Sequence, residues 1–238
     1  MRIVVAEARV PYVVDGAVLH ARALTDQLRR RGHDVELVSL PLHPAKDRLL
    51  DQAAAWRLLN LTQSNTAPID RLIATRFPTW FVRHPRKVAW VIHQHRQAYE
   101  LFGTPFSDFT DTPGDRTLRD RITALDTAML GECARVVTNA ANTAVRLRRF
   151  NGIQAEPLYH PPPEADALRE GISGHDVLVV ARLEPLKRVD LAVDAMALEP
   201  PPIRLVVVGD GSQREAVAQR AAALGLGPDR IVFRGALW

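Results

Sequence analysis

Short runs of consecutive apolar residues alternate along this chain with longer segments in which apolar residues recur every three or four positions. The uninterrupted runs are typical of strands buried on both faces of a parallel sheet, and the spaced pattern is typical of helices packed against one. Strands are predicted at residues 3–6, 34–40, 69–74, 88–92, 135–138, 177–180, 203–208 and 231–233. Helices are predicted at residues 17–31, 45–61, 116–132, 140–150, 189–196 and in a segment that ends at 224. This alternation predicts an α/β fold of doubly wound, Rossmann-like units.

Prolines mark the predicted end of the first unit. Pro161, Pro162 and Pro163 follow one another, and consecutive prolines make a stiff, extended connection that suits a domain boundary. We therefore expect an amino-terminal domain at residues 1–162 and a smaller carboxyl-terminal domain at residues 163–238.

Composition limits the class of protein. The 238 residues are 47% apolar and 24% charged, and no apolar run is long enough for a signal peptide or a membrane-spanning helix. We therefore expect a cytoplasmic protein. The single cysteine, Cys133, excludes an internal disulfide. The net charge of +4 suits a phosphate-bearing ligand or an anionic membrane surface, but it is too small to indicate nucleic-acid binding.

The best candidate for a binding site follows the predicted strand at residues 177–180. Arg182 and Lys187 lie in the turn between this strand and the next helix. In such a unit the turn lies outside the carboxyl end of the strand, where helix amides point outward and favour anions. Arginine holds a phosphate in a fork and lysine adds a point charge, so the turn predicts a phosphate site. The alternative is that both are ordinary surface residues.

Three motifs around this turn resemble a known family. They are Arg-Leu-Glu-Pro-Leu-Lys at 182–187, Val-Val-Gly-Asp-Gly at 207–211 and Arg-Ile-Val-Phe-Arg-Gly at 230–235. In order and spacing they resemble the nucleotide-sugar-binding domain of the retaining glycosyltransferases of family four, which have the GT-B fold. Residues 28–38 resemble the first helix and second strand of the same family's amino-terminal domain. The resemblance implies two Rossmann-like units that face one another across a cleft.

The resemblance also implies roles for single residues. Arg182 and Lys187 would hold the donor diphosphate and stabilise its charge as the sugar leaves with retained configuration. Fixed positive charge can stabilise a leaving group without a metal, and the resemblance implies no cofactor beyond the nucleotide-sugar substrate. Gly209 and Gly211 would let the chain turn close to the nucleotide, and Gly235 would end the third strand beside the base.

Gly16 and His93 would complete the site from the first domain. Gly16 stands where the family usually carries a glycine pair near the donor phosphate, and a turn glycine is the alternative. Asp15 before it is the expected N-cap of the first helix. His93 ends the strand at residues 88–92, at the edge where α/β sheets bind ligands. The resemblance implies that His93 faces the transferred sugar. The alternative is that His93 has a structural role. A metal site that His93 shares with His95 is also conceivable from the sequence, but it lacks an evident third ligand.

Two further segments leave alternatives open. The long segment from residue 96 to 115 carries Tyr99, Phe102, Phe106 and Phe109. It is either a lid on the acceptor side or a loop anchored by its aromatic residues. The basic run at residues 146–149 is either a solvated helix face or a peripheral contact with the inner face of a membrane.

The family pattern continues beyond the last predicted strand with a further strand and two glutamates separated by seven residues, whereas this sequence stops at Trp238. Three strands in the usual order would leave residues 177–180 at a sheet edge, which favours association. We therefore expect a truncated glycosyltransferase with an unidentified acceptor that is weakly active or inactive alone. One alternative is a non-catalytic module that pairs with another polypeptide. The other alternative is a sugar epimerase or dehydrogenase, but this sequence lacks the G-x-G-x-x-G motif of such enzymes after its first predicted strand.

Overall fold

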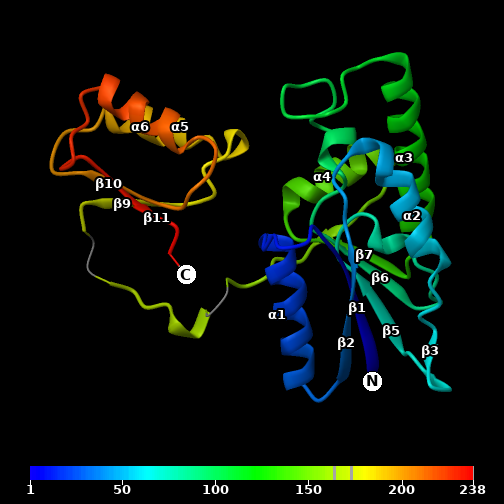
Figure 1. The fold of residues 1–238 in the computed structure, drawn as a ribbon. Coiled ribbons are helices and arrows are strands. Elements are labelled where there is room, and N and C mark those ends of the chain that lie inside the picture. Colours follow the sequence, from blue (N-terminus) through cyan, green and yellow to red (C-terminus); the bar gives the residue numbers. More distant parts are fainter. Residues whose placement is uncertain (163–164, 172–173, 238) are drawn as a thin grey trace. The chain divides into compact units, whose positions relative to one another are not determined.

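The computed structural model describes residues 1–162, 165–171 and 174–237 and divides into two compact units. Unit 1 spans Met1–Asp166 and unit 2 spans Ala167–Trp238 (Figure 1). The division falls after Asp166, whereas the sequence places it after Pro162. Pro163, where the second predicted domain begins, and Trp238 lie outside the described residues.

Unit 1 is built on a six-stranded sheet in the order β2-β1-β5-β6-β7-β8, and all neighbouring strands are parallel. Its strands are β1 (Arg2–Arg9), β2 (Asp34–Pro41), β5 (Arg71–Ala74), β6 (Lys87–Val91), β7 (Arg135–Thr138) and β8 (Glu156–Pro157). Its helices are α1 (Gly16–Arg30), α2 (Leu49–Leu58), α3 (Pro113–Gly131) and α4 (Ala141–Asn151). Short 3₁₀ turns lie at Lys46–Arg48, Thr79–Phe81 and Arg96–Ala98, and β3 (Gln63–Ser64) and β4 (Ala67–Pro68) form a small hairpin.

The alternation of side chains along β1 explains why helices cover both faces of this sheet. Ile3 and Val5 pack in one cluster with Ala21 of α1. Val4 and Ala6 point the other way and belong to the cluster that contains residues of α2, α3 and α4. Successive side chains of a strand lie on opposite faces, so a strand apolar at every position requires cover on both sides.

The predicted helix at residues 45–61 is shorter than expected. A 3₁₀ turn at Lys46–Arg48 precedes α2, which ends at Leu58. Leu59 has extended backbone angles, and Asn60 forms a parallel bridge with Arg83. The apolar residues at positions 59 and 61 continue the helical spacing, but they pack against the core of unit 1 from an extended segment. Periodicity alone therefore placed this helix end wrongly.

Unit 2 contains a three-stranded parallel sheet in the order β11-β10-β9. Its elements are β9 (Asp176–Val180), a 3₁₀ turn at Pro185–Lys187, α5 (Val189–Met196), β10 (Arg204–Val208), α6 (Arg214–Ala223) and β11 (Ile231–Gly235). A further 3₁₀ turn at Ala165–Ala167 crosses the division between the units. Leu205 and Val207 of β10 are fully buried in one cluster with Val193 of α5 and Val217 of α6. The two helices therefore share the core of this sheet.

The strand β9 lies at the edge of this sheet, as the sequence predicts. Among the described residues it pairs only with β10. Val177, Leu178 and Val180 are 47%, 61% and 70% exposed. An apolar strand with an open edge favours association with another chain.

The described part of the chain contains no helix that is both long enough and apolar enough to cross a membrane.

Candidate functional site

Three loops meet at the carboxyl edge of the sheet in unit 2. The loop after β9 is bonded to the loop after β10 through Leu183 N and Asp210 O, 2.9 Å apart. The loop after β10 is bonded to the end of β11 through Gly209 N and Gly235 O, 2.8 Å apart. The structure thus brings together at one edge the segments that carry all five site residues predicted in this unit. These are Arg182, Lys187, Gly209, Gly211 and Gly235.

Gly209 and Gly211 are required by the approach of two backbone segments. Gly209 has φ +135°, and a Cβ atom there would lie 1.8 Å from the carbonyl oxygen of Ala181. Gly211 has φ +157°, and a Cβ atom there would lie 2.5 Å from the carbonyl oxygen of Leu183. Both values lie in the region that favours glycine. The close neighbour of these glycines is thus the chain's own loop, a reason that sequence reasoning missed, and their contact with a nucleotide stays a prediction.

The turn that carries the two candidate cations is bonded to the loop after β10 through a side chain. Glu184 accepts hydrogen bonds from the hydroxyl of Ser212 at 2.8 Å and from its backbone N–H at 3.4 Å. Arg182 and Lys187 are both exposed, and among the described residues neither forms an ion pair. The neighbouring Arg188, in contrast, pairs with Asp190 at 3.0 Å. The charge of Arg182 acts on the nearby Glu184 without a direct ion pair. The turn therefore presents two exposed cations at the carboxyl edge of unit 2.

His93 lies at the carboxyl edge of unit 1, two residues beyond the end of β6. Its Nδ1 atom is 2.7 Å from the carbonyl oxygen of Gln94. A carbonyl can only accept, so Nδ1 carries the proton and donates it. Burial, followed by the charge of Arg76, lowers the pKa of His93. The imidazole is therefore neutral at pH 7, and Nε2 offers a lone pair to a hydroxyl group.

Arg76 is a candidate that sequence reasoning missed. It follows β5 by two residues, and its side chain forms an ion pair with Asp15 at 3.0 Å. The residue is only 8% exposed, and its Nε atom is buried without a hydrogen-bond partner. Arginine side chains are mostly exposed, so a buried guanidinium at an edge where ligands bind is unusual. The available signal was an arginine two residues after the predicted strand at residues 69–74.

Asp15 links this arginine to the first helix. Its carboxylate accepts hydrogen bonds from the backbone N–H groups of Ala17 and Val18, both at 3.0 Å, and so caps α1 as predicted. Burial raises the pKa of Asp15, but the bond from Val18 and the charge of Arg76 outweigh it, so the pKa lies below its usual range. Asp15 is therefore ionised at neutral pH.

Gly16 is the first residue of α1 and has open space in front of it. A Cβ atom there would meet nothing within 4 Å, and the residue does not have a positive φ. The chain itself therefore gives no steric reason for glycine at this position. The predicted approach of a donor phosphate to Gly16 stays a prediction.

His95 does not lie beside His93 in a continued strand. The strand ends at Val91, and the His95 ring lies 5.7 Å from the ring of Phe77 and 6.4 Å from that of Phe109. Burial lowers the pKa of His95 to about 4. Within the part of the chain that the structure describes, no group of three or more His, Cys, Asp or Glu side chains is placed to hold a metal ion.

The segment after His95 is anchored by its aromatic residues. Tyr99 and Phe109 are 4% and 0% exposed, and Phe102 packs against the same core. Only Phe106 is exposed. Of the two alternatives for residues 96–115, these positions favour the anchored loop.

A buried polar network supports the segment around His93. The side-chain N–H of Gln94 donates to Asn151 at 3.1 Å, and Asn151 donates to the hydroxyl oxygen of Tyr99 at 3.4 Å. Tyr99 in turn donates to Asp126 at 2.7 Å, and Trp80 donates to the same carboxylate at 2.9 Å. One atom of the network, Oε1 of Gln94, is buried without a partner. The other bonds hold the members in one arrangement and so support the carbonyl of Gln94 that orients His93.

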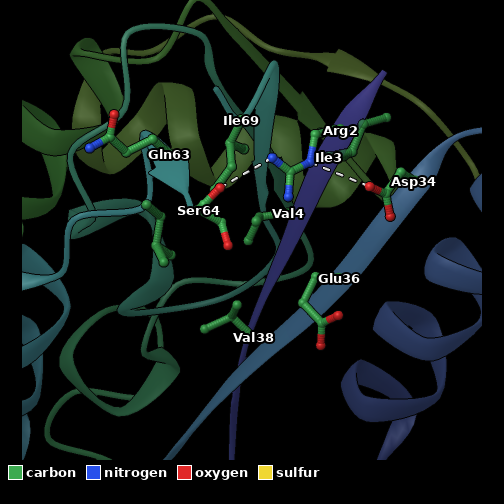
Figure 2. A pocket seen from close by; sticks show the side chains of 10 residues that line it. Arg2, Ile3, Val4, Asp34, Glu36, Val38, Gln63, Ser64 and Ile69 are labelled. Carbon is green, nitrogen blue, oxygen red and sulfur yellow. Dashed lines mark hydrogen bonds and ion pairs between the residues drawn. The ribbon is translucent and has the colours of Figure 1, made fainter. Parts of the chain in front are cut away.

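Two pockets lie away from these residues. Figure 2 shows a pocket of about 270 Å³ at the amino ends of β1 and β2, where Arg2 contacts Asp34 and the carbonyl oxygen of Ser64, both at 3.4 Å. A second one, of about 610 Å³, lies between Leu24 of α1 and the strands β5 to β8. Ligands of parallel α/β sheets bind at the carboxyl ends of the strands, so the edges that carry His93 and Arg182 are the better candidates.

Comparisons with known proteins relate part of the chain to a known family. Residues 169–237 match the family model described as glycosyl transferases group 1, and this range contains the Arg182–Lys187 turn and the three glycines of unit 2. A comparison with curated protein sequences found no match.

Two solved structures are similar to almost the whole chain. The lipopolysaccharide outer core galactosyltransferase WaaB, in its apo form, matches with a TM-score of 0.55 and 12% identity over 99% of this chain and 68% of that one. HepE from Anabaena, solved in complex with UDP, matches with a TM-score of 0.58 and 15% identity over 100% of this chain and 70% of that one. The chain therefore has the GT-B-like α/β fold of these proteins, as the sequence predicts, and its second unit matches a glycosyltransferase family model.

Proposed function

We propose that this chain is a glycosyltransferase that moves a sugar from a nucleoside diphosphate sugar to an acceptor. The observation that carries the proposal is the match of residues 169–237 to the group 1 glycosyl transferases, because this range contains a turn with two exposed cations that form no ion pair among the described residues. The UDP bound in HepE supports a nucleoside diphosphate as the donor's leaving group.

In this proposal Arg182 and Lys187 bind the diphosphate. As the bond between sugar and diphosphate breaks, negative charge develops on the leaving oxygen, and the two side chains stabilise that charge more than they stabilise the intact donor. The bond between Glu184 and Ser212 holds the turn in place before the donor arrives. No metal ion is needed for this step, because the fixed charges of the turn supply the stabilisation.

His93 serves the sugar side of the reaction in this proposal. Its neutral imidazole presents Nε2 as an acceptor, and a sugar hydroxyl can donate to it. The donation from Nδ1 to the carbonyl of Gln94 fixes the tautomer that makes this possible. We also propose retention of configuration at the transferred carbon, in line with the resemblance of the sequence motifs.

The experiment follows the anomeric configuration of the sugar. The chain is incubated with UDP-, GDP- and ADP-linked α-glucose, and the product first formed by transfer to water or to a simple alcohol is observed by NMR. Release of the nucleoside diphosphate together with the α-anomer supports the proposal. Formation of the β-anomer contradicts retention. A reaction that Arg182→Ala leaves unchanged contradicts the assigned site.

A second candidate is a non-catalytic module that pairs with another polypeptide. The exposed apolar edge of β9 favours it, because such an edge can add a strand from a partner. The two candidates predict different results in a turnover assay. The glycosyltransferase shows turnover by itself, whereas the module shows turnover only after another polypeptide has added to β9.

A further inference from the structure

The ends of β5 and β6 are tied together directly before two of the site residues. Ile92 donates its backbone N–H to the carbonyl oxygen of Thr75 at 3.1 Å. Arg76 follows Thr75 and His93 follows Ile92 along the chain. The guanidinium of Arg76 and the imidazole of His93 therefore start from neighbouring points of one sheet edge.

Helix α4 brings a second arginine to the same point. Thr143, in its first turn, donates its hydroxyl to the carbonyl oxygen of Ile92 at 3.3 Å. Arg146 donates from Nη2 to the hydroxyl oxygen of Thr143, also at 3.3 Å, and its side chain is only 14% exposed. This residue of the basic run is thus held against the end of β6, and neither a solvated face nor a membrane contact accounts for it.

Arg96 contributes a third guanidinium and shares one carboxylate with Arg146. Glu100 accepts from Arg96 at 2.5 Å and from Arg146. The only other carboxylate that pairs with these arginines in the described residues is Asp15, which pairs with Arg76. Three guanidinium groups thus share two carboxylates beside a neutral histidine, which leaves one positive charge without a counter-ion.

Buried donors in this cluster also lack acceptors. The Nε atoms of both Arg76 and Arg146 are buried and have no hydrogen-bond partner, and on the acceptor side Oε2 of Glu100 is also buried without one. Buried donors are paired in almost all folded proteins, so unpaired ones point to a ligand or to a rearrangement that pairs them. The three arginines also act on His93 electrostatically, because each of their charges lowers its pKa in addition to the effect of burial.

We propose that Arg76, Arg96 and Arg146 form an anion subsite beside His93 that binds a phosphate group of the acceptor. Three forked guanidinium groups from three chain segments suit the several oxygens of a phosphate. The subsite belongs to unit 1 and is distinct from the turn of unit 2 that is proposed to bind the donor diphosphate. The assignment of the bound phosphate to an acceptor rests on the proposed glycosyl transfer. The binding of phosphate itself does not depend on it.

The experiment uses the whole chain with ¹⁵N-labelled histidine and inorganic phosphate as the probe. The signal of His93 is assigned as the one lost in His93→Asn. Addition of phosphate at constant ionic strength is expected to shift this signal and to raise the pKa of His93, because a bound anion stabilises the imidazolium. Asp108 and His95 also act electrostatically on this part of the loop. Because the charge of Asp108 affects the pKa of His95, a change at either group is detected through the His95 signal.

Three variants and two controls make the experiment decisive. Arg76→Gln, Arg146→Gln and Arg96→Gln are each expected to weaken the phosphate effect about tenfold or more, since a charge-assisted bond is lost. Arg96 is 42% exposed, so its substitution is tolerated even if the buried arginines are needed for folding. Arg148→Gln, on the exposed side of α4, is expected to change nothing. Arg182→Ala is also expected to change nothing, which separates this subsite from the donor site.

Two results would overturn the proposal. One is a His93 signal that phosphate does not move, or moves equally in the three arginine variants and the parent chain. The other is an equal shift on addition of chloride, which would mean general screening of charge and no specific site. Loss of nucleotide binding in unit 2 would refute the proposed function and leave this subsite standing.

Discussion

The α-carbon of Gly209 lies so close to the carbonyl oxygen of Ala181 that a Cβ atom would stand 1.8 Å from it. This approach joins the loops after β9 and β10 and so sets the position of the turn that carries Arg182. The glycine thus supports the candidate site through the backbone, whether or not it touches a ligand.

Gly209→Ala is therefore expected to destabilise unit 2 by about 3 kcal/mol or more, through both the overlap with Ala181 and the strain of an L residue at φ +135°. Urea unfolding followed by circular dichroism measures the change. Gly16→Ala is the matched control, because its Cβ would enter open space at the start of a helix. The control is expected to be neutral or stabilising by up to about 1 kcal/mol, and equal effects of the two changes would contradict the account.

The buried network behind His93 predicts a loss of stability. In Tyr99→Phe the carboxylate of Asp126 loses one of its two hydrogen bonds while it stays buried. We expect a loss of about 1–3 kcal/mol, because a buried acceptor is left under-satisfied. Tyr12→Phe, at a tyrosine that is fully exposed and whose hydroxyl forms no hydrogen bond among the described residues, is the matched comparison. If Tyr99→Phe costs no more than this exposed change, the network does not support the loop.

The stability of unit 1 is expected to rise between pH 4 and pH 6.5. Burial lowers the pKa of His20 and of His95 to about 4, so in this range the unfolded chain binds two protons that the folded chain does not. Burial raises the pKa of Asp126 to about 7, so the folded chain holds one proton that the unfolded chain lacks. For these three groups, two protons less one leave a slope of about 1.4 kcal/mol per pH unit. The lowered pKa values of His84 and His93 add to the slope in the same direction.

The slope is measured from urea unfolding at several pH values. Stability from the histidines is present above pH 6.5 and is lost as the pH falls through 4, whereas the contribution of Asp126 runs in the opposite direction. His20→Asn is expected to flatten the profile and Asp126→Asn to steepen it. A profile that neither substitution changes would show that these groups do not control the pH dependence.

The open edge of β9 predicts self-association that a single charge reduces. Leu178→Glu places a carboxylate on an exposed apolar position at the edge of the sheet. Sedimentation velocity is expected to show a smaller associated fraction than in the parent chain, with unchanged unfolding. Val179→Glu, one residue on, points into the core of unit 2 and is expected to destabilise it. An associated fraction that Leu178→Glu does not change would exclude this edge as the contact.

The sequence predicts local features of this fold well because they depend on near neighbours. The strand at residues 135–138 and the helix at residues 189–196 have the predicted bounds. Asp15 caps α1 as its residue type and position indicate. Apolar runs and capping residues act over a few positions, so a single sequence carries enough information about them.

Features that depend on contacts between distant segments were missed. The burial of Arg76 follows from its pairing with Asp15 across 61 positions. The arrangement of Arg146 follows from Glu100, and the place of His95 follows from the rings of Phe77 and Phe109. Such long-range pairs leave no periodic signal in the sequence, so only the folded chain shows which charged residues are buried.

The most direct test of the central claim is nucleotide binding by calorimetry. UDP, GDP and ADP are titrated into the parent chain and into Arg182→Ala, Lys187→Ala and the matched control Arg188→Ala, whose side chain is already paired with Asp190. We expect one nucleotide to bind, each of the first two substitutions to weaken it about 10- to 100-fold, and Arg188→Ala to bind like the parent. Binding that survives the loss of Arg182 and of Lys187, or no binding of any nucleotide, would contradict a donor site at the carboxyl edge of unit 2.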